Sequence, residues 1–178
     1  AQFLYKNNVK IISTGGTKKI LEKNNIKVTS VSEITNQKEI MDGRVKTIHP
    51  KIFGGILADR NQDNHINDLM NVDGKTIDLV VVNLYPFQKE AVDKNLSLKK
   101  AIEFIDIGGP SMLRAAAKNY KYVIPLCKPM QYNGFMNDFR NNKGIISDEK
   151  RIQYANSVFK ETFSYDNIIS NYFSNDNF

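Results

Sequence analysis

Two loops of the sequence combine glycines or cations with hydroxyl groups, as phosphate binding requires. Residues 13–17 (Ser-Thr-Gly-Gly-Thr) follow a short β-branched run and lead into an expected helix. Glycines let the backbone approach a ligand closely, and amides at a helix start attract anions. A tight turn with a helix N-cap explains this segment equally well. Residues 44–47 (Arg-Val-Lys-Thr) place two cations on one side of an extended stretch, for which a solvated basic loop is the simpler interpretation.

Asn83 and Tyr85 are placed where they could orient a substrate. They come at the end of the most apolar run in the chain, whose centre is Leu-Val-Val-Val at residues 79–82. In open parallel sheets, ligands bind beyond the carboxyl ends of the strands. Core packing accounts for the neighbouring Leu84 and Phe87 but gives no reason for Asn83.

Asp106 and Lys118 are candidates for proton transfer. Asp106 lies between Ile105 and Ile107, and apolar neighbours raise the pKa of a carboxyl group whereas a nearby lysine lowers it. Two structural alternatives stay open. Asp106 could simply cap the helix that follows, and Lys118 could complement the negative end of a helix dipole.

The elements that must position these groups alternate between strands and helices. Short β-branched runs predict strands at residues 9–14, 26–31, 77–84 and 122–126. Helical spacing and capping residues predict helices at residues 1–7, 17–24, 50–57, 61–71, 97–105, 111–118, 131–140 and from 147 onward. This alternation predicts an α/β fold, a three-layer α/β/α sandwich with a mainly parallel sheet and right-handed crossovers. The length of 178 residues suggests one domain.

Composition excludes several classes of protein. With 41% hydrophobic and 25% charged residues, the chain has the usage of a globular domain rather than of a disordered or fibrous one. Its apolar runs are far shorter than the roughly 20 residues of a membrane span, so we expect no membrane association. Lys and Arg number 25 against 19 acidic residues, and the resulting charge of +6 suits an anionic partner.

Metal and disulfide chemistry are not expected. Cys127 is the single cysteine, which excludes an internal disulfide and fits a reducing, cytoplasmic compartment. His49 and His65 are too far apart in sequence to form a helical metal-binding pair.

Each motif alone is a weak signal, but the motifs taken together in their order along the chain are specific for one family. The runs STGGT, DGRVKTIHPKIFGGILADR, IDLVVVNLYPF and IDIGGPSMLRAAAKN resemble the N-terminal domain of the AICAR transformylase/IMP cyclohydrolase family of purine biosynthesis enzymes. The resemblance covers essentially the whole chain. It implies a methylglyoxal-synthase-like fold and the ring closure of formyl-AICAR to inosine monophosphate (IMP). It also implies a homodimer, no cofactor for this step, and 10-formyltetrahydrofolate only for a separate transformylase domain.

The resemblance also assigns site residues. The family's catalytic groups correspond to Lys46, Tyr85, Asp106 and Lys118. Its substrate loops correspond to Thr14, Gly15, Gly16, Thr17, Arg44, Val45, Lys46, Thr47, Val82, Asn83, Asp106, Ile107 and Gly108. Our hypothesis is that Asp106 and Lys118 transfer protons while Lys46 and Tyr85 orient the amide and stabilise charge.

Two difficulties accompany this assignment. A fully helical connection between Asp106 and Lys118 would span about 18 Å at 1.5 Å per residue, so sharing a substrate requires a partly non-helical connection. Family members also begin with a strand and a Ser-Val-Ser-Asp-Lys-Thr-Gly type loop, which nothing before Ala1 matches. We therefore expect residues 1–178 to be a cyclohydrolase domain without its first strand and without the transformylase domain.

Two other functions compete with catalysis. A regulatory domain of the same fold would use the 14–17 loop to bind a nucleotide without turnover. A nucleic-acid-binding module is suggested only by the positive charge, and the dispersed lysines, without an aromatic-basic strand motif, argue against it.

Overall fold

The computed structural model describes residues 1–174, and the chain divides into two compact units, Ala1–Thr76 and Ile77–Phe178. From the length we had expected a single domain. Each unit contains a pair of short parallel strands with helices around it, and the units are described separately below.

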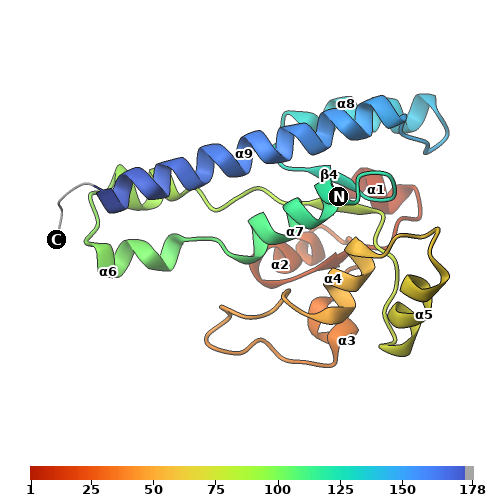
Figure 1. The fold of residues 1–178 in the computed structure, drawn as a ribbon, viewed down its shortest axis with the longest axis horizontal. Coiled ribbons are helices and arrows are strands. Elements are labelled where there is room, and N and C mark those ends of the chain that lie inside the picture. Colours follow the sequence, from red (N-terminus) through yellow and green to blue (C-terminus); the bar gives the residue numbers. More distant parts are fainter. Residues whose placement is uncertain (175–178) are drawn as a thin grey trace. The chain divides into compact units, whose positions relative to one another are not determined.

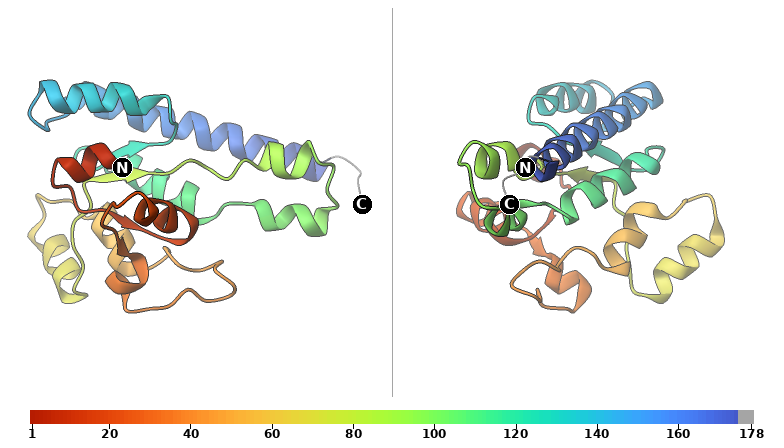
Figure 2. Two further views of the ribbon diagram at one scale, coloured as in Figure 1. Left: turned by 180° about the vertical axis from the view of Figure 1, so that it is seen from behind. Right: turned by 60° about the vertical axis from the view of Figure 1, so that its left-hand side comes forward.

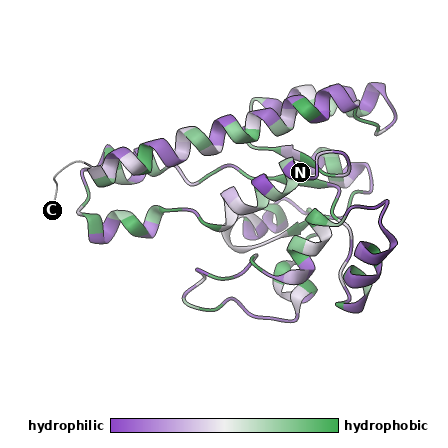
Figure 3. Ribbon diagram, in the orientation of Figure 1, coloured by the Kyte–Doolittle hydropathy of each residue, from purple (hydrophilic) through white to green (hydrophobic). Residues whose placement is uncertain are grey.

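The first unit is built around β1 (Ile12–Ser13) and β2 (Thr29–Ser30). The two strands are parallel, with Ile12 opposite Thr29 and Ser13 opposite Ser30. Five helices accompany them (Figure 1), namely α1 (Gln2–Lys6), α2 (Gly15–Lys23), α3 (Val31–Thr35), α4 (Pro50–Leu57) and α5 (Asp63–Asn71). Only Leu69 of α5 is buried, and most of that helix is hydrophilic (Figure 3).

Helix α3 was missed in the sequence because it lies in a polar stretch. Ser30 and Glu33 form a capping box there: the Ser30 hydroxyl accepts the Glu33 amide and the Glu33 carboxylate accepts the Ser30 amide. The Ser-x-x-Glu spacing is itself a signal of a helix start. It could have revealed this helix from the sequence.

The second unit contains β3 (Leu79–Val81) and β4 (Ile124–Leu126), which are also parallel, with Val80 opposite Pro125. Its helices are η1 (Gln88–Val92, a π-helix), α6 (Leu98–Ala101), η2 (Ile102–Phe104, 3₁₀), α7 (Gly108–Lys118), α8 (Gln131–Asn141) and α9 (Asp148–Ser174). Helix α9 packs against α7 and β4, and its Val158 and Thr162 are almost fully buried.

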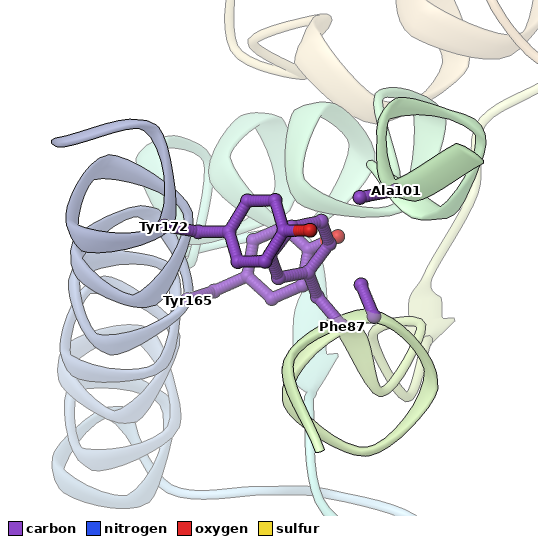
Figure 4. Close-up of a cluster of buried hydrophobic side chains, with 5 residues drawn as sticks. Phe87, Ala101, Tyr165 and Tyr172 are labelled. Atoms are coloured by element: carbon purple, nitrogen blue, oxygen red, sulfur yellow. The ribbon is translucent and has the colours of Figure 1, made fainter. Parts of the chain in front are cut away.

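A hydrophobic cluster of the second unit lies where η1 and α6 meet the C-terminal half of α9 (Figure 4). Phe87, Ala91 and Ala101 pack there against Tyr165 and Tyr172 of α9. The rings of Phe87 and Tyr172 meet edge to face, with 5.5 Å between their centroids. This geometry is favourable for aromatic pairs and fixes the end of α9 on η1.

The structure confirms the expected helices, but several of them begin or end at residues other than those expected. Helices α2 and α7 begin at Gly15 and Gly108, earlier than expected, because first-turn amides need no partner within the helix and Pro110 has no amide to satisfy. Each strand is only two or three residues long, shorter than the β-branched runs suggested. Val81, although it belongs to the most apolar run of the chain, is 43% exposed.

The second unit should lose stability at alkaline pH. Burial is the main cause that raises the pKa of the Cys127 thiol above 9.0 and the pKa values of the Tyr154 and Tyr165 phenols above 10.0. Above pH 9–10 the unfolded chain therefore loses these protons before the folded chain does. The folded state then binds more protons than the unfolded state, so the free energy of unfolding falls as pH rises.

Urea unfolding at pH 8 and pH 10.5 measures this effect. We expect a lower midpoint at pH 10.5, and a smaller decrease in a Tyr154→Phe, Cys127→Ser variant. An equal decrease in both proteins would assign the pH dependence to other groups.

Candidate active site

The 14–17 loop forms an open helix N-terminus in the first unit. Thr14 has extended backbone angles (φ −128°, ψ 165°) and occupies the N-cap position of α2, as the structural alternative anticipated. Its hydroxyl makes no capping hydrogen bond, however, and the first turn carries no acidic residue. Gly15 has φ +51°, and a Cβ added at Gly16 would meet nothing within 4 Å. The loop therefore presents backbone amides and free space to an anion.

Lys46 lies beside this helix start. Its ammonium nitrogen is 4.0 Å from the position that a Cβ on Gly15 would occupy. The structure thus brings the glycine loop and the basic loop together, although they are thirty residues apart in sequence. An ammonium group beside free amides strengthens the attraction for a phosphate.

A tight left-handed turn orients the basic loop. Met41, Asp42 and Gly43 all have positive φ values, between +52° and +86°. Reciprocal backbone hydrogen bonds of 3.1 and 3.3 Å join Ile40 to Val45 and close the turn. Left-handed conformations cost non-glycine residues of order 1 kcal/mol each. The connection between α3 and α4 that carries this turn extends outward from the helices (Figure 2).

In the second unit, Asn83 follows the carboxyl end of β3, as predicted. The Val82 amide continues the strand pairing by donating to the Leu126 carbonyl at 3.0 Å. The Asn83 Oδ1 atom then accepts a hydrogen bond of 3.0 Å from the Tyr132 hydroxyl. This bond occupies one acceptor position of Oδ1, and the amide NH₂ of Asn83 is a donor that a ligand could use. Tyr132 was missed in the sequence, although the segment after β4 is another place to look for ligand contacts.

Tyr85 and Asp106 belong to adjoining segments of the same unit. Tyr85 is 52% exposed, and its ring lies 5.9 Å from that of Phe104, two residues before Asp106. Asp106 is half-buried, and its Oδ1 accepts the Gly109 amide at 2.9 Å. The capping role considered for Asp106 is therefore present. Among the described residues, Oδ2 of Asp106 has no hydrogen-bond partner, so one carboxylate oxygen stays available for chemistry.

Lys118 lies at the opposite end of α7 from Asp106. The helix runs without a break from Gly108 to Lys118, which corresponds to about 15 Å of rise. Only residues 106 and 107 of the connection lie outside the helix, so most of the chain between Asp106 and Lys118 is helical. Lys118 is exposed at the last turn, where a cation complements the helix dipole.

Other features of the described residues lie away from these groups. Two hollows of about 430 and 450 Å³ open on the second unit, one around Ile145 and one around Arg114 and Phe163, and no predicted site residue lines either. In residues 1–174, no three His, Cys, Asp or Glu side chains form a metal-binding group. No helix in the same range is long and apolar enough to span a bilayer.

Comparison with known families decides the classification. The family model described as MGS-like domain matches residues 1–111, which is more than half of the chain. The chain belongs to the MGS-like domain family. A second model, described as AICARFT/IMPCHase bienzyme, matches residues 116–178 of this MGS-like chain. The α/β fold and the family resemblance drawn from the sequence motifs are thereby confirmed.

Curated relatives of this MGS-like chain carry the name "Bifunctional purine biosynthesis protein PurH". The protein from Leptospira biflexa is 51% identical over 97% of the chain, and that from Staphylococcus aureus strain JH1 is 47% identical over 99%. These matches cover 34% and 35% of the relatives, so the chain spans about a third of their length. Among solved structures, the "Crystal structure of ForH" is similar, with a TM-score of 0.84 and 29% identity over 98% of this chain and 90% of that one.

Proposed function

We propose that this chain is an IMP cyclohydrolase domain that closes the purine ring of formyl-AICAR to give IMP and water. The observation that carries the proposal is the identity of 51% across 97% of the chain with a bifunctional purine biosynthesis protein. The open glycine loop, the adjacent Lys46 and the partly free Asp106 carboxylate support it. The relatives are about three times longer, so a transformylase activity elsewhere in the same protein is part of the proposal.

Ring closure needs proton transfer but no redox chemistry. The carboxamide nitrogen bonds to the formyl carbon, and one of its protons moves to the former formyl oxygen. The formamide nitrogen then gives up its proton as the carbon–oxygen bond breaks, and the oxygen leaves as water. An enzyme must hold the two groups face to face, accept and donate these protons, and stabilise charge on the departing oxygen.

Each unit, taken by itself, contains groups of the kind that this reaction needs. In the first unit, the amides of residues 14–17 and the cations of residues 44–47 suit the nucleotide phosphate. In the second unit, Asn83, Tyr85 and the 106–108 segment suit the reacting base, with Asp106 as the group that transfers protons. Lys118 remains a member of the set through the family resemblance alone. Lys118→Ala tests that membership, because unchanged ring closure would remove it.

A binding-only regulatory domain is the competing function. Titration of the full chain with IMP, followed by an assay of formyl-AICAR cyclisation, separates the two possibilities. Binding together with turnover supports the cyclohydrolase. Binding without turnover supports the regulatory domain.

The resemblance further supports a cytoplasmic homodimer that needs 10-formyltetrahydrofolate only for the transformylase step.

Replacing Lys46 should weaken nucleotide binding. A hydrogen bond to a charged group contributes about 1.5–3 kcal/mol, so Lys46→Met is expected to raise the Kd for IMP by about 10- to 100-fold. Lys27→Met is the matched control, because it removes the same charge from an exposed loop of the same unit. Isothermal titration of the two variants measures the difference. Equal Kd values would show that Lys46 does not contact the phosphate.

A further inference from the structure

Tyr165 of α9 is joined to the backbone on both sides of Ile105. Its hydroxyl oxygen accepts the Asp106 amide at 2.8 Å and donates to the Phe104 carbonyl at 3.3 Å. The two bonds span 59 and 61 residues of sequence. The side chain points from α9 into the buried cluster with Phe87 and Ala101 (Figure 4), and the residue is only 7% exposed.

The segment that Tyr165 holds has no support from regular structure. Helix η2 ends at Phe104, Ile105 is extended (φ −78°, ψ 113°), and α7 begins only at Gly108. The Phe104 carbonyl and the Asp106 amide therefore have no partner in a strand ladder, and partly buried backbone groups need one. One phenol supplies both bonds. The connection that carries the Asp106 carboxylate is thus fixed by a side chain from the distant helix α9.

We propose that Tyr165 is a positioning residue for the cyclohydrolase reaction, which sets the orientation of the Asp106 carboxylate by fixing the backbone on which it is carried. This inference rests on the proposed function. Asp106 is held at two points. Its carboxylate Oδ1 accepts the Gly109 amide, and its backbone amide donates to the Tyr165 hydroxyl. Oδ2 has no hydrogen-bond partner among the described residues and is the oxygen left for the reaction. A displacement of about 1 Å at a reacting group can reduce the rate about 10²-fold.

Burial keeps the phenol in the form that the two bonds need. Burial is the largest cause and raises the pKa of Tyr165; the hydrogen bond from the Asp106 amide lowers it by less, and the Asp106 and Asp166 carboxylates raise it by smaller amounts. The hydroxyl therefore stays protonated at neutral pH and donates to Phe104 while it accepts from Asp106.

Tyr172 provides a matched control for the experiment. It lies on the same helix and in the same cluster, and it is also 7% exposed. Its hydroxyl donates to the carbonyl of Leu96, which precedes Asp106 by ten residues. Tyr165→Phe and Tyr172→Phe thus each remove one buried hydroxyl bonded to backbone. Only the first removes a bond to the segment that carries Asp106.

The test measures kcat, KM and Tm for both variants in the full chain, with formyl-AICAR as substrate. We expect Tyr165→Phe to lower kcat at least tenfold with KM within about twofold of wild type, and Tyr172→Phe to leave both constants within twofold. Both variants should show a similar decrease in Tm. A kcat for Tyr165→Phe within twofold of Tyr172→Phe would overturn the inference while wild-type turnover left the proposed function intact. An inactive wild type would overturn both.

Hydrogen exchange in the wild-type chain is a second measurement that does not depend on variant folding. We expect the Asp106 amide to exchange as slowly as the central amides of α9, because its bond breaks only when Tyr165 leaves the cluster. Rapid exchange at Asp106 would overturn the inference.

Discussion

Asp106→Asn is expected to lower kcat for ring closure by about 10²- to 10⁴-fold, the usual contribution of a group that transfers protons. Asparagine has nearly the same shape, and its carbonyl oxygen can still accept the Gly109 amide that Oδ1 of Asp106 accepts at 2.9 Å. The start of α7 should therefore stay folded. What the variant loses is the negative charge and basicity of the oxygen that has no other partner.

Asp166→Asn is the control for this experiment. Asp166 is an exposed residue of α9 in the same unit, so the substitution removes the same charge without touching the 106–109 segment. Steady-state assays should give a kcat near wild type for Asp166→Asn. Equal activity of the two variants would exclude Asp106 from proton transfer.

Gly109→Ala is the second change with a large expected effect. A Cβ at Gly109 would lie 2.3 Å from Oδ2 and 2.9 Å from Cγ of Asp106, distances that require the carboxylate to move. The carboxylate cannot move without weakening its bond to the Gly109 amide. We expect kcat to fall at least 10²-fold, since a small displacement of a reacting group has an effect of that size.

The control for Gly109→Ala is Gly134→Ala. Gly134 lies within α8, and a Cβ there would meet nothing within 4 Å. This substitution should leave kcat unchanged and stabilise the chain by about 0.5–1 kcal/mol, because alanine is the better helix former. Thermal unfolding and activity assays of both variants distinguish the effects. If Gly109→Ala kept wild-type activity, the Asp106 carboxylate would not need its present position.

Local sequence signals predicted most of the helices. Pro50 begins α4, and the Ser147-Asp148-Glu149 signal marks the start of α9 at Asp148, because proline geometry and first-turn charges act within a few residues. The extent of the strands depends on pairing with distant partners. The strand expected at residues 9–14 is therefore longer than β1, which pairs only at Ile12 and Ser13. The π-helix at Gln88–Val92 had no local signal that we recognised.

Some candidate site residues could be chosen from local sequence signals alone. The glycine loop, Asn83 and Asp106 were found from residue type and their place after strands or before helices. The contacts that orient them were not, because the Tyr132 hydroxyl reaches Asn83 across 49 residues and the Tyr165 hydroxyl reaches Asp106 across 59. The continuous helix of α7 likewise separates Asp106 from Lys118, which the sequence left undecided.

The rate of IMP formation from formyl-AICAR tests the central claim most directly. The full chain, with formyl-AICAR as its only substrate and no added cofactor, should form IMP far faster than the uncatalysed solution, and the rate should be proportional to protein concentration. A chain that binds IMP but leaves the cyclisation rate at the uncatalysed value would contradict the assignment and identify a binding domain instead.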